Sequence, residues 1–347
     1  MITVNQYFSK KITLISFIMS IFVVYIHSNN LVNVGLAEEI TSIDYIATRI
    51  IVECFARIAV PFFFMMSGYW FFRFDFSDIK GDLTTIKSKL LKKVKSLVVP
   101  YLIWNTFVYL FFIVITRIPF VFNLMNMDDA VGVDFKSIIF NVFLHEQNYP
   151  MWYVQNLLVL LLMTPLFLLM LKNKYISLVT LTMLGVLCCM GFSWDYCQTS
   201  SIFFFLLGAI IAVYYRKFFE ERSNKKIALI ASGILVFRIV SAYFEFPVLS
   251  TVALLFSPVA LVKFFDVFND FKVNWFTKQS FFVYCAHLLP TTIVMKILAK
   301  LFGGNDLLAC LAFMVTPFVT LIGLYIVAKI MIRFMPKLYG LLCGGRS

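Results

Sequence analysis

Long apolar segments recur along the chain, and short stretches that carry most of the charges separate them. A membrane-spanning helix needs about 20 predominantly apolar residues. Segments of this kind occupy residues 12–30, 48–72, 97–118, 150–171, 175–193, 200–215, 227–243, 248–266, 279–299 and 307–333. The pattern predicts an all-α polytopic membrane protein with about ten transmembrane helices. The first is expected to be an uncleaved span, because no small-residue cleavage site follows it.

Basic and acidic connections alternate along this predicted topology. The basic set comprises Lys10/Lys11, residues 73–96, Lys172/Lys174, residues 216–226, Lys272/Lys278 and the tail after Arg333. The other connections contain Glu38/Glu39, Asp128/Asp129/Asp134, Asp195, Glu245 and Asp306. Cytoplasmic loops of membrane proteins retain Lys and Arg. We therefore expect the basic connections and both termini on the cytoplasmic side.

The composition agrees with a membrane location. Hydrophobic residues make up 61% of the 347 residues and charged residues 14%, which is too apolar for one soluble core. The formal charge of +12 follows from the basic loops, so we expect no nucleic-acid partner. The seven cysteines show no metal-ligand spacing, and no metal site is expected. One membrane domain over residues 1–347, with no separate soluble domain, accounts for the chain; a short interfacial helix is expected near residues 136–146.

Ionisable residues inside membrane spans are costly and mark candidate functional sites. His27 lies roughly 22 Å from the cytoplasmic start of the first span, at 1.5 Å per residue. Glu53 precedes Arg57 by one helical turn in the second span, in the favourable order for an ion pair. Two interpretations are open: Glu53 neutralises Arg57 for insertion, or a held guanidinium stabilises negative charge in a dry catalytic site.

Other polar groups at depth are also open to two interpretations. His287 is either a hydrogen-bonded packing residue or a chemical one, and Arg238 is a deep cation with Glu245 as its expected partner. His145, in an outer connection, is interpreted as an ordinary surface histidine. Within "RIAVPFFFMMSGYWFF" (residues 57–72), small residues such as Gly68 favour close helix packing.

Aromatic and amide side chains gather at the expected outer end of the fourth span, in the sequence "YPMWYVQNLL" (residues 149–158). Trp152 and Tyr153 fit an interfacial aromatic belt. The same aromatic faces, with Gln155 and Asn156 nearby, also suit a sugar, which needs stacking and hydroxyl hydrogen bonds. Both interpretations stay open at this point.

Four motifs together resemble one family. "FVVYIHSNN", "RIAVPFFFMMSGYWFF", "MWYVQNLLVLLLMTPLF" and "FFVYCAHLLP" occur in the order, and at about the spacing, seen in the acyltransferase 3 family of integral membrane acyltransferases. The chain looks like a stand-alone member close to the surface-polysaccharide O-acetyltransferase branch. The resemblance implies transfer of an acyl group, usually acetyl from acetyl-CoA, to a glycan hydroxyl at or beyond the cytoplasmic membrane.

The resemblance also implies site residues. The essential histidine of the family matches His27, its second-helix motif matches Arg57, Pro61, Phe63, Phe64, Ser67, Gly68 and Tyr69, and its late Tyr-x-x-His matches Tyr284 and His287. One departure is Ser16, which stands where many members carry an arginine. Either Lys10, Lys11 or another helix supplies that charge, or the donor binds differently.

From these matches we expect His27 to act as general base, with Arg57 stabilising the oxyanion or a donor phosphate and Glu53 holding the arginine or orienting the imidazole. The acceptor is a glycan or lipid-linked saccharide. Its expected contacts are Ser67, Tyr69, Trp152, Tyr153, Asn156 and His287. Acetyl-CoA would enter from the cytoplasm beside Lys92 and Lys93. Two other classes stay open: a transporter or flippase for a lipid-linked sugar, and a non-catalytic membrane sensor.

Overall fold

The computed structural model describes residues 5–28, 46–118, 132–144, 148–194, 197–302 and 306–345. The described residues are 85% helical and form no named strand. An all-α, multi-pass architecture is therefore confirmed. The expected outer positions Glu38, Asp128, Asp195 and His145 lie outside the described residues.

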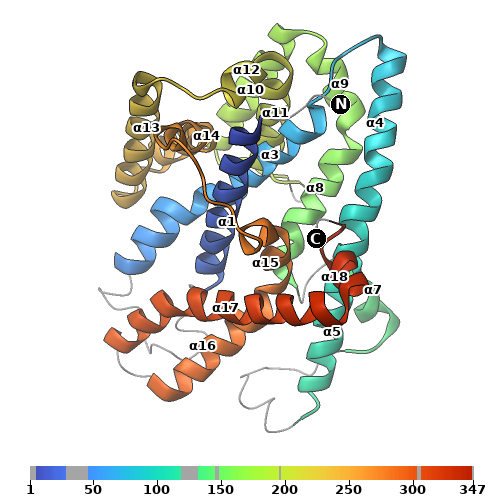
Figure 1. Cartoon of the computed structure of the whole chain (residues 1–347), viewed down its shortest axis with the longest axis vertical. Coiled ribbons are helices and arrows are strands. Elements are labelled where there is room, and N and C mark those ends of the chain that lie inside the picture. The colour runs from blue at the N-terminus through green and yellow to red at the C-terminus, as the bar shows by residue number, and fades with distance from the viewer. Residues whose placement is uncertain are drawn as a thin grey trace. The chain divides into compact units, whose positions relative to one another are not determined.

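Within the described residues, six helical segments are long and apolar enough to cross a membrane (Figure 1). They are α1 (Gln6–Ser28), the continuous segment Ile46–Phe72 that ends in α3 (Ala59–Phe72), the segment Ile79–Ile115 formed by α4 (Ile79–Lys93), η3 (Val94–Val98) and α5 (Val99–Ile115), α13 (Lys225–Tyr243), α14 (Pro247–Phe264) and α17 (Asp306–Phe334). Each overlaps one of the apolar segments predicted from the sequence.

Two further predicted spans are bent. The short helix η4 (Tyr149–Met151) with α8 (Trp152–Leu162) meets α9 (Thr164–Leu171) at 57°, and Pro165 lies in the first turn of α9. The segment η6 (Phe276–Gln279) with α15 (Ser280–Ala286) meets α16 (Leu288–Phe302) at 76°, just before Pro290. Proline has no N–H and disfavours continuation of the preceding turn, which accounts for both breaks.

The remaining two predicted spans are shorter helices. α10 (Lys174–Cys189) and α11 (Thr199–Tyr214) have 16 residues each. Such a helix is about 24 Å long, less than the roughly 30 Å of a hydrocarbon core. All ten predicted segments are thus helical over most of their described length, but in the part of the chain that the structure describes, length and composition support six spans, or eight if each bent pair counts as one.

The expectation of a basic loop over residues 73–96 is wrong for most of its length. α4 begins at Ile79 and continues through the π-helical turn η3 into α5. Its sequence, IKGDLTTIKSKLLKK, is rich in Lys and Leu, which are good helix formers. The lysine density therefore reflects an exposed helix face. The expected helix near residues 136–146 is present as α7 (Phe135–Phe143), capped by Asp134, which accepts a hydrogen bond from the Ser137 N–H.

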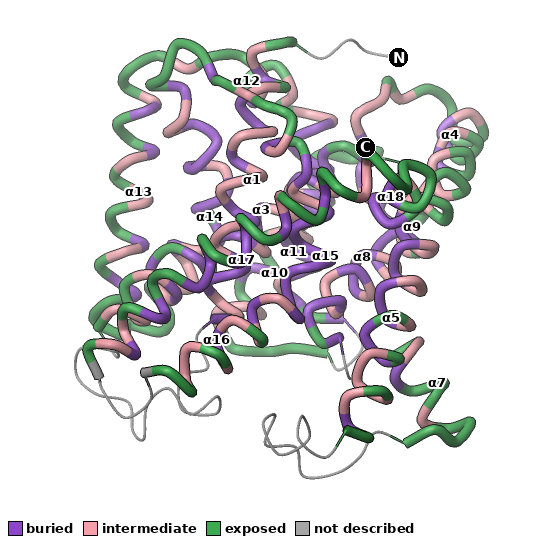
Figure 2. The backbone as a smooth tube through the Cα atoms, turned by 60° about the horizontal axis from the view of Figure 1, so that its bottom comes forward, coloured by how far each residue is buried: buried purple, intermediate pink, exposed green. Residues whose placement is uncertain are grey.

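The best-buried helix pair is α3 with α11, and both are largely buried in Figure 2. Two glycines allow this approach. A Cβ atom on Gly68 would lie 2.0 Å from the Phe205 carbonyl oxygen, and one on Gly208 would lie 1.9 Å from that of Met65. The structural interpretation of Gly68 as a close-packing residue is confirmed. In contrast, α13 is largely exposed, as expected of a lipid-facing helix (Figure 2).

The chain divides into two compact units. The first comprises Met1–Val23, Arg49–Lys92 and Asn156–Lys278, and the second Val24–Thr48, Lys93–Gln155 and Gln279–Ser347. The boundary passes through α1, α4, α8 and η6, so each of these helices contributes residues to both units. His27 belongs to the second unit and Arg57 to the first.

Candidate active site

The candidate site in the second unit is built around His27, in the last turn of α1. Its Nδ1 atom lies 2.7 Å from the hydroxyl of Tyr149, the first residue of η4, and the two rings are 4.9 Å apart between centroids. Both side chains are partly accessible. The negative end of the α1 dipole favours a positive charge at this position, which a general base acquires when it takes a proton.

His287 lies at the bend between α15 and α16, and its ring centroid is 5.0 Å from that of His27. Its side chain is completely buried. Nδ1 lies 2.6 Å from the Tyr284 carbonyl oxygen, which can only accept, so Nδ1 carries a hydrogen. In the neutral ring, Nε2 then has a lone pair, and no described residue hydrogen-bonds to it.

Tyr284 connects the bend at His287 with η4 through its backbone carbonyl and its side-chain hydroxyl. Its carbonyl fixes the tautomer of His287, and its hydroxyl donates to the carbonyl of Pro150, the neighbour of Tyr149. The ring of Tyr153 packs edge-on against Tyr284, with centroids 5.6 Å apart. The Tyr-x-x-His motif therefore places one imidazole beside another and holds η4 against them. A site with imidazoles and phenols is suited to accepting and returning a proton.

Tyr149 is the member of this site that sequence reasoning missed. It begins the "YPMWYVQNLL" segment, but a tyrosine beside a proline at a membrane edge resembles an ordinary belt residue. Its pairing with His27 joins distant parts of the chain and leaves no periodic signal in the sequence.

The predicted ion pair of Glu53 and Arg57 is confirmed in the first unit. Arg57 Nη2 lies 2.9 Å and Nε 3.1 Å from Glu53 Oε1. Both side chains are about half exposed, so the pair contributes at most about 1 kcal/mol to stability. Glu53 lies in the π-helix η1 (Arg49–Phe55) and Arg57 in the following 3₁₀ turn η2 (Ala56–Ile58). Such π-helical turns are frequent at functional sites.

Arg238 reaches the same segment from α13. It is buried, and it donates to the Glu53 carbonyl oxygen at 2.5 Å and to Ser250 Oγ at 2.6 Å. The expected partner Glu245 forms an ion pair with Arg49 at 2.8 Å, so the pairing inferred from sequence is wrong. The irregular turns of η1 and η2 present the Glu53 carbonyl to Arg238. The spacing of residues in the sequence does not predict this hydrogen bond.

His27 and Arg57 lie in different units, so their meeting in one cavity stays a prediction. The same holds for donor binding near Lys92 and Lys93, which lie at the end of α4 and not in a loop. Trp152 and Tyr153 are partly accessible on α8, while Asn156 is buried, with Nδ2 3.5 Å from Ser201 Oγ. A role for these three side chains in binding the acceptor also stays a prediction.

Tyr69, expected near the acceptor, is completely buried and donates to Glu220, which also pairs with Arg73 at 2.6 Å. Burial raises the pKa of Glu220, but hydrogen bonds from Arg73 and Tyr69 and the charge of Arg73 outweigh it, so the pKa lies below its ordinary value. These contacts are structural, and substrate binding by Tyr69 and the half-buried Ser67 stays a prediction.

The lysines near the Ser16 position are both paired with carboxylates. Lys11 is completely buried with its Nζ 2.5 Å from Asp266 Oδ1, and Lys10 lies 3.3 Å from Asp270. Lys263 also approaches Asp266, at 3.5 Å, and donates to backbone carbonyls that include that of Glu221. Lys11 therefore anchors the start of α1 within the first unit.

Comparison with known proteins identifies the family. The family model for the acyltransferase 3 family, described as an acyltransferase domain, matches residues 10–337, nearly the whole chain. The chain belongs to this family of membrane acyltransferases. Searches of curated proteins and of solved structures found no match.

Proposed function

We propose that this protein transfers an acetyl group from acetyl-CoA to a hydroxyl of a surface glycan or its lipid-linked precursor, with His27 as general base. The observation that carries the proposal is the cluster of His27, Tyr149 and His287, in which a partly accessible imidazole contacts a second, buried one. Family membership supplies the reaction class. The donor, acceptor and base are our inference.

Base catalysis sets a requirement on the tautomer of His27. If Nδ1–H donates to the Tyr149 oxygen, Nε2 keeps a lone pair that can take the proton of the sugar hydroxyl. The hydroxyl oxygen then bonds to the thioester carbonyl carbon. On collapse of the tetrahedral intermediate the carbon–sulfur bond breaks, and the imidazolium returns its proton to the departing CoA thiolate. General-base assistance of this kind is worth about 10²–10⁴ in rate.

His287 has a separate role in the proposal. Its unpartnered Nε2 is an acceptor in a buried place beside His27, and buried polar atoms are normally satisfied. We assign it to bind the acceptor by accepting a hydrogen bond from a sugar hydroxyl. Trp152, Tyr153 and Asn156, with Ser67 and Tyr69, are the further proposed contacts to the saccharide.

Arg57, which forms an ion pair with Glu53, is the proposed electrostatic partner of the reaction. A guanidinium aimed at the developing oxyanion or at a donor phosphate would contribute about 10²–10³ in rate. We place the protein in the cytoplasmic membrane with both termini inside. Acetyl-CoA then enters from the cytoplasm past Lys92 and Lys93, and no metal or nucleic acid takes part.

The test uses purified protein in proteoliposomes, radiolabelled acetyl-CoA and an acceptor glycan. Label on the glycan, abolished by His27→Gln, supports the transferase. Unlabelled glycan that crosses the bilayer would identify a transporter. If neither transfer nor transport is observed, the interpretation as a membrane sensor is supported. Mass spectrometry of surface glycan from cells with and without the protein then identifies the acyl group from the mass difference.

A further inference from the structure

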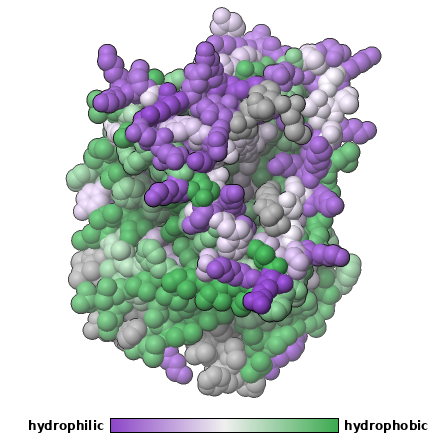
Figure 3. Space-filling model, in the orientation of Figure 1, coloured by the Kyte–Doolittle hydropathy of each residue, from purple (hydrophilic) through white to green (hydrophobic). Residues whose placement is uncertain are grey.

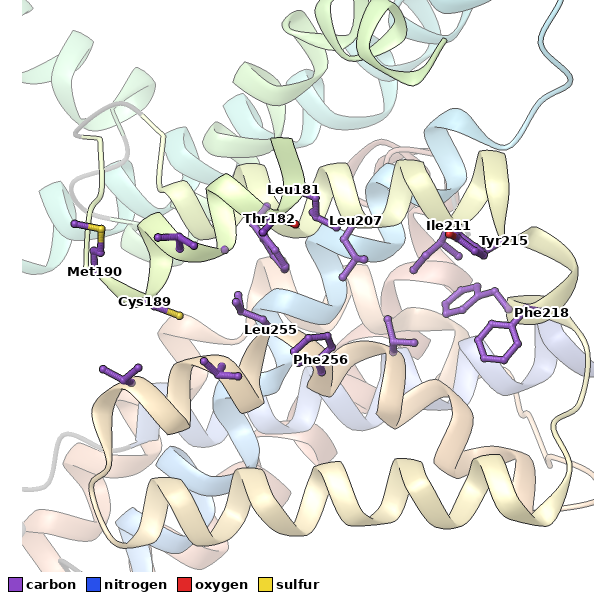
Figure 4. Close-up of a pocket in the computed structure, with 17 residues that line it drawn as sticks. Leu181, Thr182, Cys189, Met190, Leu207, Ile211, Tyr215, Phe218, Leu255 and Phe256 are labelled. Carbon is purple, nitrogen blue, oxygen red and sulfur yellow. The ribbon is translucent and has the colours of Figure 1, made fainter. Parts of the chain in front are cut away.

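An elongated apolar groove lies in the first unit. Its volume is about 790 Å³. α10 and α14 form its two sides, α11 lines its floor, and Tyr215 with Phe218 of α12 (Arg216–Glu220) closes one end, opposite Met190 (Figure 4). Volumes of this size, lined mainly by apolar side chains, are typical of ligand sites.

The groove has a buried floor and an exposed rim. Phe203 and Leu255 are less than a tenth exposed, whereas Val186, Met190 and Phe256 on the rim are 53%, 75% and 59% exposed. Gly185 lets the helices approach at the narrow point, since a Cβ there would lie 3.3 Å from Phe203 and 3.4 Å from Leu255. The groove thus opens sideways on the apolar surface of the protein. Figure 3 shows broad apolar areas of this kind on the visible face.

The chemistry of the lining favours a hydrocarbon ligand. Thr182 and Tyr215 are the lining residues with hydroxyl groups, and no charged residue lines the groove. A ligand that carries hydroxyl or amide groups would lose its hydrogen bonds to water on entering the groove. A lipid acyl chain loses none, and the side opening gives it direct access from the bilayer.

A cation lies at the closed end. Lys174 Nζ lies 5.0 Å from the ring centroid of Tyr215, and within the described part of the chain it forms no ion pair. Arg216, by contrast, forms an ion pair with Asp75 and donates a hydrogen bond to the Phe74 carbonyl.

We propose that the groove is a binding site for an anionic phospholipid, with its acyl chains between α10 and α14 and its phosphate at Lys174. Basic groups where transmembrane helices end on the cytoplasmic side are a recurrent site for acidic lipid headgroups. A second copy of the chain would also cover the apolar rim, but the cation at one end favours a phosphate.

The experiment uses the purified full chain in detergent with phosphatidylglycerol that carries a photoactivatable diazirine in one acyl chain. Mass spectrometry maps the labelled peptides. We expect label within residues 181–190 and 248–259, and weaker labelling by the corresponding phosphatidylcholine. Val252→Trp fills the groove and should remove most of this label. Val236→Trp, on the lipid-facing side of α13, is the matched control and should not.

The headgroup is tested separately, without disturbing the groove. Lys174→Ala should lower phosphatidylglycerol labelling by roughly fivefold, because a cation near a phosphate contributes about 1 kcal/mol. The control replaces the exposed Lys225 by Ala. Equal labelling by both lipids, no effect of Lys174→Ala, or equal loss in Val252→Trp and Val236→Trp would overturn the proposal. So would a crosslinked dimer in place of lipid adducts.

Discussion

The imidazole rings of His27 and His287 lie with their centroids 5.0 Å apart and their planes inclined at 33°. One ring is partly accessible at the end of α1, and the other is completely buried at a helix bend. Two charged imidazoles at this separation would repel each other, so we expect at most one of the two rings to carry a positive charge during the proposed reaction.

Tyr149→Phe should lower acetyl transfer by roughly five- to tenfold. The change removes the hydroxyl that holds His27 Nδ1, and a neutral hydrogen bond is worth about 1 kcal/mol. The measurement is kcat/KM with labelled acetyl-CoA. Tyr175→Phe, in which an exposed tyrosine outside the cluster is changed, serves as the control. An unchanged rate for Tyr149→Phe would show that this hydroxyl does not orient the base.

His287→Phe should lower the rate by about tenfold or more while the protein remains folded. The substitution removes Nε2, a buried acceptor with no described partner, which should stabilise the folded protein. It also removes the hydrogen bond from Nδ1 to the Tyr284 carbonyl, which should destabilise it, so the net change in stability should stay within about 1 kcal/mol. Activity and thermal unfolding in detergent are measured together. A large loss of stability with activity retained per folded molecule would make His287 a packing residue.

Gly68→Ala should destabilise the protein by about 1–3 kcal/mol or prevent folding, because the added methyl group would lie 2.0 Å from a backbone carbonyl oxygen. The matched control is Gly233→Ala on α13, where a Cβ meets nothing within 4 Å. The control should stabilise its helix by up to about 1 kcal/mol. Equal melting temperatures for the two variants would contradict the close α3–α11 packing.

The stability contributed by Glu220 should be lost in acid. Its folded-state pKa lies below the ordinary value of 4.5, so its contribution is present above that pH and declines as the pH falls toward the folded-state pKa. Glu220→Gln should therefore be less stable than the wild type at pH 7, and the difference should shrink below about pH 4.5. Melting temperatures measured across this range give the comparison. A difference that is constant with pH would exclude the Arg73–Glu220 pairing as its source.

Much of the architecture could be predicted from the sequence, because apolar segments of span length and i,i+4 charge pairs are local signals. Hence the ten helical segments and the Glu53–Arg57 pair were found. The helix over residues 79–93 was missed because a segment rich in lysine is also typical of a cytoplasmic loop.

Long-range pairings, by contrast, leave no local pattern. Tyr149 beside His27, Arg238 on the Glu53 carbonyl and Lys11 with Asp266 each join distant segments. The two helix bends occur at Pro165 and Pro290, and whether a proline bends a helix depends on how the surrounding helices pack. The site residues named from the family motif were placed in two units, so the sequence order alone could not establish how they come together.

The most direct test of the central claim is the rate of acetyl transfer by His27→Gln, measured with labelled acetyl-CoA on folded protein whose melting temperature matches the wild type. We expect a fall of about 10²–10⁴, the usual contribution of a general base, with donor binding retained. Transfer at the wild-type rate in this variant would contradict the assignment of His27 as the base.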